Sequence, residues 1–200
     1  MVGSQSKVLY KIVTNMLHMS QNNYKLKIVE ALLRSENHIR GLAKLLNTSQ
    51  TTIARKVKEL HEDNVVDFKQ EGKNKIVFLK RSIEAIQFAY AVETLKLVTL
   101  LKKYPYLRRI VALIKKNKQI RLAILFGSFA KGLARQNSDI DIYIDTTNKK
   151  IKKEVELIDS RISVKIGKYN KDSLLIKEIE KNHVIIKGVE NYYEKNKFFG

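Results

Sequence analysis

The sequence lacks cysteine and tryptophan, and it contains a single proline in 200 residues. Without cysteine the chain has neither disulfide bonds nor thiolate metal sites, which fits a cytoplasmic location. No apolar run reaches the roughly 18 residues that a membrane-spanning helix needs, and the start of the chain lacks the uninterrupted apolar segment of a signal peptide. We therefore expect no membrane segment.

Acidic residues are also few relative to basic ones. The chain has 20 Asp and Glu but 39 Lys and Arg, which gives a formal net charge of +19. A charge of this sign indicates a polyanionic partner, with a solvated basic surface as the alternative. Hydrophobic residues make up 44% of the chain. This content is typical of a soluble globular protein, and the length allows two small domains.

Residues 24–80 follow the order helix, helix, helix, hairpin. Apolar residues recur at helical spacing in three successive segments, and Ser49 is expected to cap the third helix. Residues 65–80 alternate as two strands around the turn "EGKN". Three short helices and a basic hairpin resemble a winged helix-turn-helix domain, which we place at residues 1–81.

That resemblance implies that the third helix enters the major groove of double-stranded DNA and that the hairpin reaches neighbouring phosphates. We expect few acidic residues on this surface. The alternative is a small helical domain with an ordinary charged face, or one that binds protein. The candidate DNA-binding residues are Gln50, Thr51, Thr52, Arg55, Lys56, Lys58, Lys73 and Lys75.

The linker of residues 82–105 predicts one long helix over residues 82–103 that ends before Pro105, because proline is poorly tolerated inside a helix. Apolar residues form a broad stripe along this helix, so other parts of the protein must pack against it on more than one side. The helix therefore either lies between two domains or pairs with its copy in a homodimer. The residues of its main apolar stripe are Ile83, Ile86, Tyr90, Leu97 and Leu101.

The most informative segment, residues 121–144, contains a buried strand, a Gly-Ser turn, a short helix and a second strand. In the second strand Asp139 and Asp141 share one face, since side chains alternate with a period of two, and isoleucines occupy the other face. A cation with oxygen ligands, such as Mg²⁺, relieves the repulsion between paired carboxylates. Gly127 permits close backbone approach, and Ser128 begins a helix whose free N–H groups favour phosphate.

Gly-Ser, ten residues and then Asp-Ile-Asp resembles the signature of the DNA polymerase beta-like nucleotidyltransferase superfamily, above all its minimal members. The resemblance implies that Gly127 and Ser128 hold the triphosphate of an NTP. It also implies that Asp139 and Asp141 hold a catalytic Mg²⁺ or Mn²⁺.

Lys131 and Arg135 lie in the intervening turn and are candidates to neutralise the triphosphate, with an ordinary surface role as the alternative. The expected fold class is thus α/β (α+β). A winged helix-turn-helix is followed by a long linker helix and by a polymerase-beta-like domain with a small mixed sheet over residues 106–200.

Active members of the superfamily usually carry a third carboxylate on a following strand, where it helps to activate the attacking hydroxyl. The matching strand, "RISVKIG", instead places Ser163 and Lys165 on the face where that acid is expected. A general base contributes typically about 10²–10⁴-fold, so its loss need not abolish phosphoryl transfer. A lysine in the metal's place is the alternative.

Three functions follow from these features. The first is a DNA-binding, metal-dependent nucleotidyltransferase that transfers a nucleoside monophosphate to an unknown acceptor. The second is a winged-helix transcriptional regulator whose C-terminal domain senses a nucleotide with reduced catalysis. The third comes from the family resemblance alone, and is an antitoxin-type nucleotidyltransferase that acts on a partner toxin.

Overall fold

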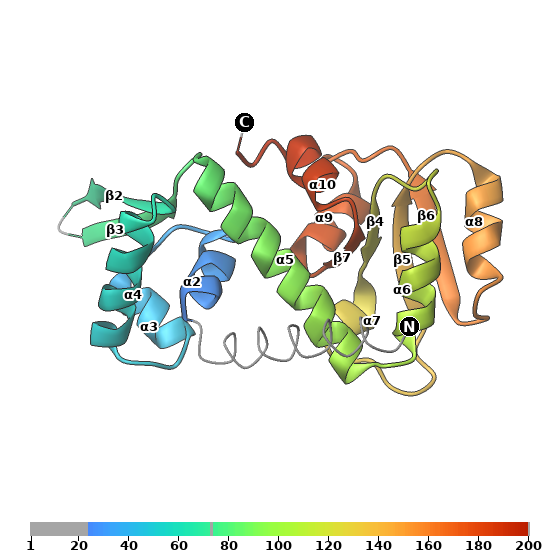
Figure 1. Ribbon diagram of the computed structural model, residues 1–200, viewed down its shortest axis with the longest axis horizontal. Helices are drawn as coiled ribbons and strands as arrows, with labels where there is room; N and C mark the ends of the chain where they lie inside the picture. The colour runs from blue at the N-terminus through green and yellow to red at the C-terminus, as the bar shows by residue number, and fades with distance from the viewer. Residues whose placement is uncertain (1–23, 73, 200) are drawn as a thin grey trace, which may run out of the picture. The chain divides into compact units, whose positions relative to one another are not determined.

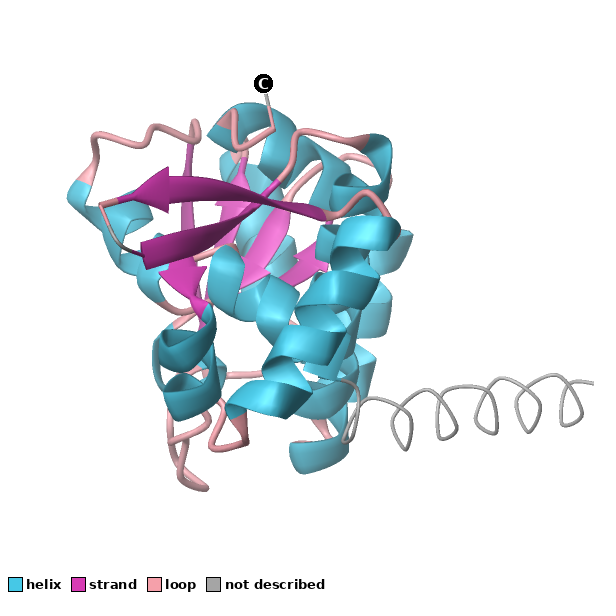
Figure 2. Cartoon of the chain, turned by 90° about the vertical axis from the view of Figure 1, so that its left-hand side faces the viewer, coloured by secondary structure: helices cyan, strands magenta, loops and turns pink. Residues whose placement is uncertain are grey.

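The computed structural model describes residues 24–72 and 74–199. Their contacts divide into two compact units, one up to Leu95 and the other from Lys96 to Phe198. The division falls within a single helix, α5 (Ile83–Lys103), which ends before Pro105 as predicted. Each unit combines helices with a small sheet, so the fold class is α+β (Figures 1 and 2). In these ranges no helix combines the length and the apolar composition that a bilayer crossing requires.

The first unit has the topology of a winged helix-turn-helix. Strand β3 lies between β1 and β2 and pairs antiparallel with both, so that β2 and β3 form the hairpin. Ser49 caps α4 as predicted, because its Oγ accepts a hydrogen bond from the N–H of Thr52 at 3.1 Å. The elements in chain order are α2 (Tyr24–Leu32), β1 (Asn37–His38), α3 (Ile39–Leu45), α4 (Gln50–Glu62), β2 (Val66–Glu71) and β3 (Asn74–Leu79).

The apolar faces of these short helices meet in one core. Complete burial of an aliphatic side chain contributes about 1.5–3 kcal/mol, and the core holds Ile28, Leu42, Ile53, Val57, Leu60 and Val77 with no exposed area.

The predicted stripe of α5 was wrong at its start, because Ile83 is 75% exposed. The buried positions there are Ala85, Ala89 and Val92. Small side chains let a helix approach its neighbours closely, and the apolar pattern alone did not mark that face.

The second unit is built on a mixed sheet in the order β6-β5-β4-β7. Strands β5 and β6 are parallel, whereas β4 is antiparallel to both β5 and β7. A small mixed sheet was predicted and is confirmed. After α5 the elements are α6 (Leu107–Lys116), β4 (Ala123–Leu125), α7 (Gly127–Ala130), β5 (Ile140–Asp145), α8 (Lys149–Glu156), β6 (Ile162–Gly167), α9 (Leu174–Lys181), β7 (Val184–Lys187) and α10 (Val189–Asn196).

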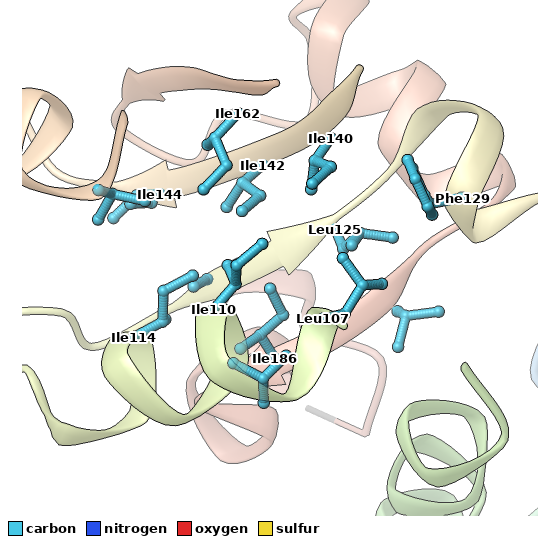
Figure 3. Packing of buried hydrophobic residues seen from close by; sticks show 14 of the residues in the cluster. Leu107, Ile110, Ile114, Leu125, Phe129, Ile140, Ile142, Ile144, Ile162 and Ile186 are labelled. Carbon is cyan, nitrogen blue, oxygen red and sulfur yellow. The ribbon is translucent and has the colours of Figure 1, made fainter. Parts of the chain in front are cut away.

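One face of this sheet is closed by helix packing. Ile140, Ile142 and Ile144 of β5 are fully buried and point toward the apolar side of α6, where Ile110 and Ile114 lie (Figure 3). The alternation predicted for β5 is therefore confirmed. Because successive side chains of a strand project to opposite faces, the acidic residues of β5 lie on the other face.

Candidate active site

The Gly-Ser turn connects β4 to α7. Gly127 has φ +69°, in the left-handed region that favours glycine. A Cβ added there would lie 2.4 Å from Oδ2 of Asp141, a distance that no real contact allows. The backbone N–H of Phe126 also donates to the carbonyl oxygen of Asp141 at 3.0 Å. Glycine at this position therefore lets the turn lie directly against the second aspartate without strain, whereas a Cβ would force the carboxylate or the turn to shift.

The two predicted aspartates lie where β5 begins. Asp139 precedes the strand and is exposed, while Asp141 is half-buried on the face opposite the isoleucines. Burial raises the pKa of Asp141, the negative charge of Asp139 raises it further, and the positive charge of Lys165 acts in the opposite direction. Two carboxylates in this setting are stabilised in their ionised form by an added cation. The pair is thus suited to a divalent metal.

Strand β6 places its polar side chains beside this pair. Ser163 is opposite Asp141 in the parallel register, and Lys165 is opposite Tyr143. Within residues 24–72 and 74–199, no three acidic, histidine or cysteine side chains lie close enough together to hold a metal ion. In this part of the chain, Asp139 and Asp141 are therefore not joined by a third side chain that could hold the same metal ion.

Asp145, further along β5, is engaged elsewhere. It lies 2.9 Å from Nζ of Lys195, and it accepts a hydrogen bond from the N–H of Tyr169 at 3.0 Å. The ring of Tyr169 contacts the rings of Tyr143 and Tyr192 edge-on. Tyr143 and Tyr192, two members of this aromatic cluster, are buried. The sequence did not identify Tyr143 as part of it, because an alternating strand does not reveal what packs on each face.

The loop between Ala130 and Asp139 is held in place at several points. Nζ of Lys103, in the last turn of α5, donates to the carbonyl oxygen of Gly132 at 2.7 Å. Nη1 of Arg161 donates to the carbonyl oxygen of Gln136 at 3.3 Å. These contacts join segments far apart in the sequence, and no local pattern predicted them. They fix the path of the chain from the Gly-Ser turn to the aspartates.

Lys131 and Arg135, the predicted partners of the triphosphate, differ in their surroundings. Lys131 is exposed and forms an ion pair with Glu178 of α9 at 3.2 Å. The backbone N–H of Arg135 donates to Ser138 Oγ at 2.8 Å, which shapes the loop, and its side chain is exposed. Arg135 is therefore the more available of the two for an incoming anion.

Asp159 and Arg161 form an ion pair immediately before β6. Oδ2 of Asp159 accepts from Nη2 of Arg161 at 2.8 Å, and Oδ1 accepts from Nε at 3.1 Å and from the backbone N–H at 2.9 Å. The side-chain hydrogen bonds from Arg161 lower the pKa of Asp159 to about 2. Since Arg161 also holds the loop at Gln136, this pair supports the approach to Asp139.

This ion pair predicts a specific dependence of stability on pH. The pKa of Asp159 falls from an ordinary 3.8 to about 2 on folding, so its contribution is complete above the ordinary value and is lost as the pH falls toward 2. Asp159→Asn is expected to be less stable than the wild type at pH 6 and to approach it at pH 2.5. Urea unfolding at both pH values measures this difference. An equal loss at both values would contradict the assignment.

The candidate DNA-binding surface of the first unit is more acidic than predicted. Nζ of Lys56 lies 2.8 Å from both carboxylate oxygens of Glu59, and Lys58 lies 3.9 Å from Glu62. The expectation of few acids beside these cations was therefore wrong. Both pairs lie three or four residues apart on one helix, a spacing at which opposite charges meet. The pairing could have been recognised from the sequence.

The remaining candidates on this surface fall into three groups. Gln50, Thr51 and Arg55 are exposed on α4, whereas Thr52 is engaged in the cap through Ser49. Nζ of Lys75, on the hairpin, lies 3.9 Å from the ring centroid of Phe68. Lys73 lies outside the described residues.

Comparisons with known proteins match one segment of the chain to a family. No curated protein matches the chain. Among solved structures, that of the adhesin competence repressor (AdcR) from Streptococcus pyogenes has 21% sequence identity and a TM-score of 0.40, over 54% of this chain and 84% of that chain. This similarity is weak, and the winged-helix topology stands on the strand order given above. Residues 108–191, from α6 to α10, match the family described as Polymerase beta, Nucleotidyltransferase.

Proposed function

We propose that the second unit is a divalent-metal-dependent nucleotidyltransferase and that the first unit binds double-stranded DNA. The reaction transfers a nucleoside monophosphate from an NTP to an acceptor, with release of pyrophosphate. The observation that carries the proposal is the packing of Gly127 against Asp141, where a Cβ would lie 2.4 Å from the carboxylate oxygen. The match of residues 108–191 to the nucleotidyltransferase family supports it.

The residues at this site fit a metal-bound triphosphate. Asp139 and Asp141 supply carboxylate oxygens, the ligands that Mg²⁺ prefers, and the absence of a side chain at Gly127 lets the turn lie against the carboxylate of Asp141. A bound divalent cation would neutralise charge on the phosphate oxygens. Ser128 offers a hydroxyl and a backbone N–H at the start of α7, and Arg135 brings an exposed guanidinium. These side chains orient the triphosphate, and positioning supplies much of the catalysis in phosphoryl transfer.

The proposal is tested by label transfer. The full-length protein is incubated with Mg²⁺ and each NTP labelled at the α-phosphate, together with protein, RNA and DNA acceptors, and pyrophosphate is measured in parallel. Transfer of label that requires the metal supports the enzyme. NTP binding with neither label transfer nor pyrophosphate release supports the second candidate, a nucleotide-sensing regulator. The polar residues of β6 favour that candidate, because neither Ser163 nor Lys165 is a carboxylate that could activate a hydroxyl.

Binding of double-stranded DNA by α4 gives a further prediction. Arg55→Ala is expected to weaken binding to a selected duplex by about 5- to 100-fold, since a good contact from arginine to a base edge contributes about 1–3 kcal/mol. Lys56→Ala is the matched control, because its ammonium is already paired with Glu59. Its effect is expected to be smaller. Gel shifts with the selected duplex and with random DNA measure both variants.

The hairpin is tested in the same assay. Lys75→Ala is expected to weaken binding to all duplexes alike and to flatten the log–log salt dependence by about 0.9, the effect of one lost phosphate contact. If Arg55→Ala and Lys75→Ala both bind as the wild type does, the surface of α4 and the hairpin is not the DNA-binding surface.

A further inference from the structure

The site face of β6 carries Ser163 and Lys165, and neither is the carboxylate expected to accept a proton. Lys165 is exposed, and it follows Ser163 by two residues on β6, so both side chains project to the face of Asp141. Lys165 interacts electrostatically with Asp141. Among the described residues, however, it forms no hydrogen bond or ion pair. Lys165 therefore acts on Asp141 through its charge and has no hydrogen-bond partner among the described residues.

The proton chemistry of a lysine side chain limits the class of acceptor that this site can use. A lysine ammonium is protonated at neutral pH and has no acceptor lone pair, so it cannot remove a proton from a hydroxyl. It does attract an anion. The side chain thus favours an acceptor whose attacking oxygen is already ionised. A phosphate monoester, whose second pKa is about 6, meets that condition at neutral pH.

The distribution of charge indicates what bears this phosphate. Residues 96–200 contain 24 of the 39 Lys and Arg but only 11 of the 20 Asp and Glu. Residues 24–95, by contrast, contain 13 basic and 9 acidic residues and are nearly balanced. The positive field is therefore concentrated in the unit that carries the aspartate pair. A field of this sign raises the local concentration of nucleic acid.

We propose that the acceptor is a nucleic acid strand with a terminal 5′-phosphate, held at the site by Lys165. This proposal rests on the nucleotidyltransferase function given above. An ionised oxygen of the terminal phosphate attacks the α-phosphorus of the NTP and forms a new P–O bond. The bond from the α-phosphorus to the bridging oxygen breaks, and pyrophosphate leaves with the electron pair. No proton has to be removed from the acceptor, and the product carries an NMP through a 5′–5′ pyrophosphate linkage.

The acceptor is tested with matched oligonucleotides. DNA and RNA strands with either a 5′-phosphate or a 5′-hydroxyl, each with a dideoxy 3′ end, are offered with Mg²⁺ and α-labelled NTP. Inorganic phosphate and a protein mixture serve as further acceptors. Label on the 5′-phosphate strands alone is expected. Label on hydroxyl strands or on protein overturns this inference and leaves the nucleotidyltransferase function intact, whereas absence of label and of pyrophosphate in every arm overturns both.

Substitution of Lys165 separates its role from the general field. Lys165→Gln is expected to lower transfer to the 5′-phosphate by about 10- to 100-fold, the usual effect of losing one charged hydrogen bond, while Lys165→Arg retains most of it. Lys153→Gln is the matched control, since it removes the same charge from an exposed position on α8, whose buried residues pack in the core on the opposite sheet face. Its transfer rate is expected to change little.

Two further readouts do not depend on a general loss of activity. Lys165→Asp is expected to favour hydroxyl over phosphate acceptors, because it restores a proton acceptor and repels the anion. In fluorescence anisotropy with Mg²⁺ and an NTP analogue that resists cleavage, the wild type is expected to prefer the 5′-phosphate strand to the 5′-hydroxyl strand. Lys165→Gln is expected to lose this preference. A preference that survives in Lys165→Gln overturns the proposal.

Discussion

Replacement of Asp141 by asparagine is expected to lower the proposed nucleotidyl transfer by about 10³-fold while leaving the fold intact. The reason is that a bound metal supplies several kcal/mol of transition-state stabilisation, and each 1.4 kcal/mol or so corresponds to a factor of ten in rate. Asparagine has nearly the same shape as aspartate but lacks the charge that holds the cation. Transfer of label from an α-labelled NTP measures the rate.

The same variant has an expected effect on binding. NTP is expected to raise the melting temperature of the wild type only with a divalent metal, since a ligand that binds the folded state stabilises it by mass action. Asp141→Asn is expected to lose this shift. Asp172→Asn is the matched control, because it removes one carboxylate charge from an exposed loop position in the same unit. An equal shift with NTP in EDTA would refute the metal role of the pair.

The sheet face on which the central residues of the candidate site lie could be predicted from the sequence, because Asp141, Ser163 and Lys165 belong to two strands. A strand alternates strictly, so the isoleucines of β5 fixed the face of Asp141, and the pattern of β6 fixed the face of Ser163 and Lys165. Because β5 and β6 pair in parallel, these side chains lie on the same face of the sheet, with Ser163 opposite Asp141. Short-range periodicity was sufficient for this part of the structure.

Contacts between segments far apart in the sequence could not be predicted from periodicity. Lys131 meets Glu178, and Lys103 meets the backbone of Gly132, across 47 and 29 residues respectively. No spacing rule relates such positions, because only the tertiary fold brings them together. The buried side of α5 was missed at the start of the helix for a related reason, since a helix with apolar residues on most sides does not reveal which side is covered.

Replacement of Gly127 by alanine is expected to disable the site by steric means. Any residue with a Cβ pays about 1–2 kcal/mol to adopt a left-handed conformation. At Gly127 the Cβ would also lie 2.4 Å from Oδ2 of Asp141, so the carboxylate or the turn must move. Displacement of a reacting group by about 1 Å can lower a rate by 10²-fold. We therefore expect transfer to fall by at least about 10²-fold and the metal-dependent NTP shift to disappear.

Gly132 provides the control for backbone strain. It has the same φ of +69°, but a Cβ there would meet only Lys103 Nζ, at 3.5 Å. Gly132→Ala therefore carries the conformational cost without the clash against Asp141. Gly132→Ala is expected to lose about 1–2 kcal/mol in urea unfolding and Gly127→Ala at least as much, and only Gly127→Ala is expected to lose NTP binding. If both variants bind NTP equally well, the contact between the Gly-Ser turn and Asp141 is structural, and the triphosphate is held elsewhere.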